Sequence, residues 1–151
     1  MVRAAGYDMI ATRVELHQLA ALAQVLAEAG LPASDIAAPG RHFYRFDDED
    51  GLIGYGGVEG AGADRLLRSF IVVEARRGAG LGSAMLSALE RAAADDGATC
   101  VYLLTTTAES FFGRFGYAPI PRASAPAEIT DSAEFRSLCP ASAAFLFKRI
   151  C

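Results

Sequence analysis

The sequence has few cysteines and histidines and lacks a long apolar segment. Cys100, Cys139 and Cys151 form an odd, unpatterned set with no Cys-x-x-Cys pair, which fits a reducing cytosol better than a disulfide framework. His17 and His42 do not suggest a metal site either. No apolar stretch is long enough to cross a bilayer, and the start of the chain has no signal-peptide core. These absences predict a cytoplasmic protein with no metal ion and no membrane partner.

A shortage of positive charge argues against another class of function. The net charge is −4 at pH 7, which disfavours general nucleic-acid binding. Against this acidic background, Arg65, Arg68, Arg76 and Arg77 fall within one short stretch, which suits a small anionic cofactor better than a polymer. The length and the apolar content of 52% predict one domain, residues 1–151, with a substantial core.

The segment that organises the chain is 66–82. An apolar strand, 66–73, leads through a basic pair into the turn Gly-Ala-Gly-Leu-Gly at 78–82, and an alanine- and leucine-rich helix follows at once. The free N–H groups and the dipole of a helix start attract an anion, and glycines let a phosphate approach the backbone. Arg76 and Arg77 add forked donors suited to phosphate oxygens. The turn therefore predicts a site for a phosphate-bearing ligand.

Three phosphate-binding motifs compete for this turn. A Walker A loop needs Gly-Lys followed by Ser or Thr, and the sequence has no such run. A dinucleotide fingerprint needs Gly-x-Gly-x-x-Gly, but Ser83 stands at the sixth place. The third motif is Arg-x-x-Gly-x-Gly after an apolar strand, matched by Arg77, Gly80 and Gly82. The pattern alone leaves a simple turn and helix cap open as an alternative.

A second motif lies one helix and one strand further along. The expected strand Cys100–Thr105 precedes Ala-Glu-Ser-Phe-Phe-Gly-Arg-Phe-Gly-Tyr at 108–117. In this order the two motifs resemble the acetyl-CoA loop and the Ala-x-x-Phe-Tyr-x-x-x-Gly-Phe segment of the GCN5-related N-acetyltransferases, the GNAT superfamily. The runs at 67–69, 103–107 and 137–143 resemble one branch, the small N-acetyltransferases associated with bacterial arsenic resistance.

The resemblance implies the GNAT acyl-CoA N-acyltransferase fold, an α/β fold (α+β in some schemes). It has a mixed, mostly antiparallel sheet with a central splayed strand pair and helices on both faces. The pattern of apolar residues is compatible with this arrangement. We expect strands at 8–12, 41–46, 52–59, 66–73, 100–105 and 143–148, and helices at 14–29, 81–94 and 108–115. Short helical turns are expected at 34–38 and within 128–138.

For function, the resemblance implies transfer of an acetyl group from acetyl-CoA, the cosubstrate, to the amine of a small molecule. The branch implies detoxification of an amino-acid-like arsenical or a phosphinate antibiotic. A protein N-acetyltransferase and a non-catalytic acyl-CoA sensor stay open as alternatives. Nucleotide binding by a Rossmann-type domain is a further one, and it predicts affinity for NAD and none for CoA.

The resemblance also implies which residues contact the cofactor. Backbone amides of the turn hold the pyrophosphate, and the edge of the central strand pairs with the pantetheine amides. The N–H near Val72 polarises the thioester carbonyl. Phe112 replaces a tyrosine that often serves as general acid, which leaves protonation to water or to another hydroxyl, with Ser110, Tyr117 and Thr107 as weak candidates. The expected cofactor-binding residues are Phe70, Ile71, Val72, Arg77, Gly78, Ala79, Gly80, Leu81, Gly82, Ser83 and Phe112.

The acceptor amine must lose a proton before it attacks, and a carboxylate usually takes it. Glu59, near the end of the strand 52–59, is the first candidate, with a solvated glutamate as the competing interpretation. Arg68 and Ser69 are expected on opposite faces of the central strand, so that one of them faces the acceptor. Arg68 would there bind an oxyanion of the substrate bidentately, unless it is exposed. Thr105 ends the next strand near the thioester and completes the expected substrate-binding set.

Two further expectations concern the end of the chain. Cys139 is expected to be a small buried core residue rather than a group that meets a thiophilic arsenical. The apolar strand at 143–150 is a candidate for pairing with a second subunit, so a homodimer is among the expected partners.

Overall fold

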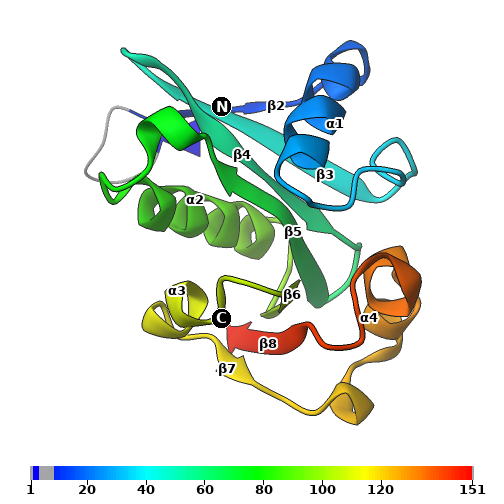
Figure 1. Ribbon diagram of the computed structural model, residues 1–151. Helices are drawn as coiled ribbons and strands as arrows, with labels where there is room; N and C mark the ends of the chain where they lie inside the picture. The colour runs from blue at the N-terminus through cyan, green and yellow to red at the C-terminus, as the bar shows by residue number, and fades with distance from the viewer. Residues whose placement is uncertain (1, 4–8, 151) are drawn as a thin grey trace.

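In the computed structural model, which describes residues 2–3 and 9–150, eight strands form one sheet in the order β1-β2-β3-β4-β5-β6-β8-β7 (Figure 1). The strands are β1 (Val2–Arg3), β2 (Ile10–Arg13), β3 (Arg41–Asp48), β4 (Gly51–Glu59), β5 (Asp64–Val72), β6 (Cys100–Thr105), β7 (Ala118–Pro119) and β8 (Ala144–Arg149). The helices are α1 (Leu19–Glu28), α2 (Leu81–Asp95), α3 (Glu109–Arg114) and α4 (Ala127–Thr130). Short 3-10 turns span Leu16–Gln18, Glu74–Arg76 and Arg122–Ser124, and a π-helical turn spans Glu134–Leu138.

The sheet is mixed and mostly antiparallel, as the resemblance implied, because β5 and β6 alone among the described strand pairs run parallel. Most expected elements are present with small shifts of their ends. The first expected helix is shorter than predicted, since a 3-10 turn replaces its first residues. Residue 8 of the first expected strand lies outside the described residues.

Helices cover both faces of the sheet (Figure 1). On one face, α2 buries Leu81, Met85 and Leu89 against strand residues that include Leu67. On the opposite face, α1 and α4 pack over neighbouring parts of the sheet, and α4 lies against Leu66. The adjacent residues Leu66 and Leu67 serve different layers because side chains alternate along a strand. None of the described helices is both long and apolar enough to cross a bilayer.

The central strand pair is splayed. Strand β5 pairs with β6 only from Asp64 to Leu66, opposite Cys100–Tyr102. Next to this pairing, β5 carries a bulge, because the register passes from Gly57 opposite Arg68 to Tyr55 opposite Ile71. Bulges bend a strand and increase its twist. The gap between β5 and β6 therefore opens toward the carboxyl ends of both strands.

Glycines in β4 allow this bent strand to pack closely. A Cβ atom on Gly54 would clash with the backbone oxygen of Ile71, and one on Gly56 would clash with Leu89 of α2. This part of β4 therefore combines a close backbone approach at Gly54 with the irregular register opposite the bulge of β5.

Strand β8 lies inside the sheet. All of Ala144–Arg149 pairs with β6, while Leu146 and Phe147 also pair with β7 on the other side. The edge expected to receive a second subunit is thus partly occupied by this chain's own β7. The homodimer stays a prediction.

Candidate active site

A cavity of about 600 Å³ occupies the gap between β5 and β6. The glycine turn before α2 lies at one end of it, and the π-helical turn Glu134–Leu138 and Cys139 lie at the other. Between them, the walls come from β5, from the end of β6 and from α3. Of the predicted site residues, those that line this cavity are Arg68, Ser69, Phe70, Ile71, Val72, Arg77, Gly82, Thr105 and Phe112. Glu59, Gly78, Ala79, Gly80, Leu81 and Ser83 are not among its lining residues.

The glycine turn is shaped for an anion. Gly78 and Gly80 have φ angles of 85° and 75°, in the left-handed region that side chains disfavour. A Cβ on Gly78 would meet nothing within 4 Å, so the turn borders open space. The 15-residue helix α2 begins within this run, at Leu81. Its first N–H groups have no partner within the helix and are available to a phosphate.

The edge of β5 presents backbone groups to the cavity. The N–H of Val73 donates to the carbonyl oxygen of Ile53 in β4, at 2.9 Å. Because peptide groups point to alternate sides along a strand, the N–H of Val72 points away from β4, into the gap. On that side the carbonyl oxygen of Val72 accepts a hydrogen bond from Arg77 Nε at 2.9 Å. An N–H directed into a cavity is suited to a developing oxyanion.

Aromatic rings from β5 and α3 form an apolar part of the cavity wall. The ring of Phe112 is buried, with centroid distances of 5.6 Å to Phe70 and 5.1 Å to Phe111. A Cβ on Gly82 would lie 3.2 Å from the ring of Phe111, so the glycine turn packs closely on this cluster. The wall is apolar and offers no hydroxyl at the position of Phe112.

At the other end of the cavity, Arg68 is fully buried, with a side-chain exposure of 0%. Its two terminal nitrogens donate to Asp35 at 2.6 Å each, one also donates to Glu59 at 2.9 Å, and the other lies 3.2 Å from Glu134 Oε2. Its Nε donates to Ser69 Oγ at 3.2 Å. Since a guanidinium has five N–H donors, each has a partner. Arg68 therefore has no free donor for a substrate oxyanion, and the prediction that it binds one bidentately is wrong.

The predicted opposite orientation of Arg68 and Ser69 is also wrong. Both residues line the cavity, and their side chains are hydrogen-bonded to each other. Ser69 lies in the bulge with a φ angle of 56°, which is rare outside glycine. The alternation of side chains along a strand fails at a bulge, and the sequence does not reveal the bulge.

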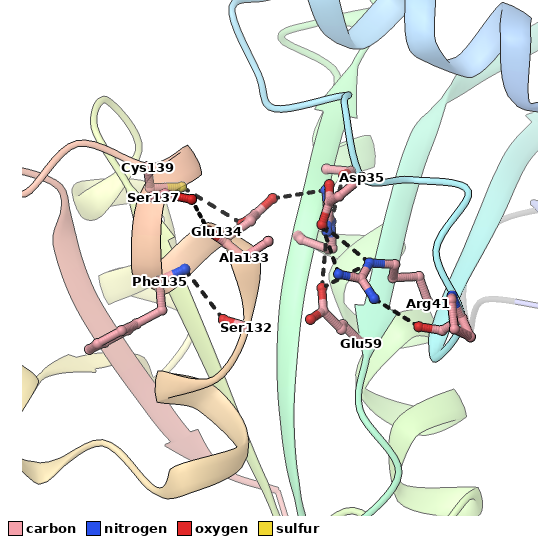
Figure 2. Close-up of polar contacts among 12 residues, drawn as sticks. Asp35, Arg41, Glu59, Ser132, Ala133, Glu134, Phe135, Ser137 and Cys139 are labelled. Carbon is pink, nitrogen blue, oxygen red and sulfur yellow. Dashed lines mark hydrogen bonds and ion pairs between the residues drawn. The ribbon is translucent and has the colours of Figure 1, made fainter.

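Glu59 is neither solvated nor part of the cavity wall. Its side chain is 11% exposed and lies 2.9 Å from a terminal nitrogen of Arg68 and 3.6 Å from Nε of Arg41 (Figure 2). Arg41 also donates to Asp35, at 3.0 and 3.2 Å. Glu59 is therefore held between two guanidinium groups. Its role as general base stays an untested prediction.

Glu134 is a functional candidate that sequence reasoning missed. It lines the cavity, and only 3% of the residue is exposed. Burial raises the pKa of its carboxyl group to about 7, although Arg68 opposes the shift, while the charges of Asp35 and Glu59 add to it. The sequence offers one indication of this role, since Glu134 lies between two apolar residues in a segment whose apolar residues show only weak periodicity.

Cys139 lies on the cavity wall and is only partly buried, so the expectation of a buried core cysteine is wrong. Its thiol donates to Glu134 Oε1, with a sulfur–oxygen distance of 3.8 Å. Burial and the neighbouring carboxylate raise the pKa of Cys139 to about 12. The group therefore stays a neutral thiol at physiological pH.

Thr105 and Tyr117 differ in their relation to the cavity. Thr105 lines it, and its hydroxyl oxygen accepts a hydrogen bond from the N–H of Ala108 at 2.9 Å, which caps the turn into α3. Tyr117 is buried away from the cavity lining and donates to Glu90 at 2.8 Å. Burial, with Glu90, raises its pKa above the usual value, which does not suit a proton donor to a thiolate.

Replacing Tyr117 with phenylalanine should therefore leave acyl transfer within about two-fold of the wild-type rate. The lost hydrogen bond to Glu90 should lower the free energy of unfolding by about 1–2 kcal/mol. Thiol release from acetyl-CoA and urea denaturation measure the two effects. A large loss of rate at unchanged stability would restore Tyr117 as the general acid.

Comparisons with known proteins agree with this geometry. A protein-family model described as the acetyltransferase (GNAT) domain matches residues 39–119. A comparison with curated proteins finds no significant match. N-acetylglutamate synthase from Neisseria gonorrhoeae, complexed with coenzyme A and N-acetyl-glutamate, has a TM-score of 0.75 at 15% identity over 95% of this chain. This chain spans only 35% of that one.

Two shorter structures match over almost their whole length. A Mycobacterium tuberculosis protein in complex with CoA and NLQ has a TM-score of 0.73 at 21% identity, over 93% of this chain and 98% of that one. A GNAT-family acetyltransferase from Staphylococcus aureus has a TM-score of 0.72 at 14% identity, over 95% and 99%. At these low identities, the structural similarity establishes the fold alone. Because the family model covers more than half of its sequence, the chain belongs to the GNAT family of acetyltransferases.

Proposed function

We propose that this protein transfers the acetyl group of acetyl-CoA to the amine of a small molecule. The observation that carries the proposal is the cavity between β5 and β6, which joins the glycine turn to a buried carboxylate. The turn suits a diphosphate and the carboxylate suits an amine. The N–H of Val72, which points away from β4, lies between these two ends along β5.

The residues present fit acetyl-CoA as the cosubstrate, which supplies the activated acetyl group. The backbone of Arg77, Gly78, Ala79, Gly80, Leu81, Gly82 and Ser83 binds the pyrophosphate. The edge of β5 at Phe70, Ile71 and Val72 pairs with the pantetheine amides, and Phe112 provides an apolar wall. The N–H of Val72 stabilises the charge that develops on the carbonyl oxygen.

The acceptor occupies the end of the cavity near Arg68. We infer that Arg68 acts there by holding carboxylates in place, since its own donors are taken. Ser69 and Thr105, which were predicted to bind the substrate, offer hydroxyl groups on the cavity wall to polar parts of the acceptor. An amino-acid-like arsenical or a phosphinate antibiotic, and with it a detoxifying role, is the specific acceptor that the sequence resemblance supports.

One observation favours a second candidate, an acyl-CoA-binding sensor without catalysis. The position of the usual acidic tyrosine is occupied by Phe112, whose ring is packed among other aromatic rings. If the protein is such a sensor, it should bind CoA but release no thiol from acetyl-CoA in the presence of any amine. Release restricted to lysine-containing peptides would instead identify a protein N-acetyltransferase.

Calorimetry with coenzyme A tests the position of the cofactor. Replacing Gly80 with valine should weaken binding at least about ten-fold, because a β-branched side chain disfavours the φ angle of 75° at the helix start. The matched control is Gly97→Val, at the other end of α2. Gly97 has a φ angle of 97° and does not line the cavity. That variant carries similar backbone strain and should keep its affinity. Equal affinities of the wild type and Gly80→Val would contradict the site.

A further inference from the structure

The carboxylates gathered around Arg68 meet the cavity through Glu134, at a place that no sequence motif indicated. We propose that Glu134 binds the amino group of the acceptor as an ammonium ion and accepts its proton. The binding subsite is the corner of the cavity that Glu134 forms with Ser69 and Cys139. This inference rests on the proposed N-acetyltransferase function and names the proton acceptor of that same site.

The first argument is position. Among the described residues that line the cavity, Glu134 is the one carboxylate. Figure 2 shows its side chain reaching from the turn Glu134–Leu138 toward Asp35 and Glu59. Its oxygens contact one nitrogen of Arg68 and the thiol of Cys139. A carboxylate offers about four lone-pair directions, so acceptor capacity remains for an ammonium group.

The second argument is charge. The cluster contains three carboxylates, Asp35, Glu59 and Glu134, and two guanidinium groups, Arg41 and Arg68. When all are ionised, one negative charge is left without a partner inside the cluster. An ammonium ion is the ligand that balances it.

Among the described residues, the cations of the cavity wall are Arg68, which is already counted in the cluster, and Arg77. Arg77 lies at the opposite end, where its Nε donates to Val72. Arg122, which lies beyond Cys139, donates to the backbone oxygens of Pro140 and Ala143. The acceptor end therefore favours a positively charged group over an anionic one.

The third argument separates Glu134 from Glu59. Glu59 is held between two guanidinium groups and does not line the cavity. Glu134 has one guanidinium contact and a carboxyl pKa raised to about 7 by burial. A base whose pKa lies near the operating pH is the more effective general base.

The proton transfers balance as follows. The ammonium group gives one proton to Glu134 and becomes a neutral amine, whose lone pair attacks the thioester carbonyl carbon. The C–N bond forms and the C–S bond breaks. The second proton lost by nitrogen ends on the thiol of coenzyme A, and Glu134 releases the first to solvent. Ammonium and thioester thus yield amide, thiol and one proton.

The test measures thiol release from acetyl-CoA with butylamine, benzylamine and the common amino acids between pH 5.5 and 9. With the best amine, kcat/KM of the wild type should rise with a midpoint near 7, the carboxyl pKa of Glu134. E134Q should lower kcat by at least about 100-fold and remove this midpoint. E134D should retain a midpoint, and E59Q should retain one at somewhat lower pH, because the charge of Glu59 adds to the raised pKa of Glu134. Unchanged affinity of E134Q for coenzyme A shows that the variant is folded.

Carbon-13 NMR of the Glu134 carboxyl, assigned by its absence in E134Q, gives a readout without turnover. Butylamine should move its titration midpoint to lower pH, because a bound cation favours the carboxylate. If the wild type turns over and E134Q keeps both its rate and its midpoint, the inference is wrong and N-acetyl transfer stands. Loss of the midpoint in E59Q alone would return the role to Glu59. If a CoA-binding wild type releases no thiol with any amine, the proposed function fails, and this inference fails with it.

Discussion

Replacing Arg68 with methionine is expected to lower the free energy of unfolding by about 3–5 kcal/mol. The substitution keeps most of the apolar stem and removes the buried charge with its hydrogen-bond donors. Asp35, Glu59 and Glu134 then face one another with Arg41 as the one remaining cation of the cluster. Their side chains are 13%, 11% and 4% exposed, so water screens them poorly.

Urea denaturation at pH 7 measures the loss, and Arg45→Met is the matched control. Arg45 pairs with Asp47, but the two side chains are 42% and 31% exposed, so this loss should stay below about 1 kcal/mol. Adding Asp35→Asn and Glu134→Gln to Arg68→Met should recover part of the stability, because fewer unpaired charges remain. Equal small losses in Arg68→Met and Arg45→Met would show that the cluster does not stabilise the fold.

The second large effect concerns pH and involves Glu134. Its folded-state pKa of about 7 lies above the ordinary value of 4.5 expected when unfolded. The folded state therefore holds the proton more tightly between these two values. The resulting stability is fully present below pH 4.5 and is lost as pH rises through 7. The loss between pH 4.5 and pH 8 should be about 3 kcal/mol.

Comparing the wild type with Glu134→Gln isolates this contribution. The shifts at Asp35, Asp48 and Asp96 lower their pKa values, so they add stability as pH rises at the acidic end, and they do so in both proteins. Between pH 4.5 and pH 8, the free energy of unfolding of the variant should therefore rise by about 3 kcal/mol relative to that of the wild type. Denaturation curves across that range measure it. A constant difference would mean that Glu134 titrates normally in the folded protein.

Much of the fold could be predicted from short-range features of the sequence. The apolar spacing of Leu81, Met85 and Leu89 predicts the buried face of α2, and the structure confirms it. Glycines at 78 and 80 predict a tight turn, and both take positive φ angles. Propensity, periodicity and glycine conformation act over a few neighbouring residues, so the sequence carries them directly.

The acceptor end was predicted less well. The orientation of Ser69 depends on a bulge that forms where β5 leaves β6 and continues along β4. The partners of Arg68 come from a loop, a strand and a distant helical turn, and no motif joins Asp35, Glu59 and Glu134. These groups meet only when the chain has folded.

The sequence by itself determined the glycine turn, the strand before it and the helix after it, because backbone conformation and apolar periodicity are short-range properties. Together with the motif at 108–117, these features carried the resemblance to the GNAT superfamily. Only the tertiary structure decided that Arg68 has no donor left for a substrate and that Glu134 is the carboxylate facing the cavity. The physical reason is that burial and charge pairing shift the properties of a side chain through contacts between segments that are distant along the chain.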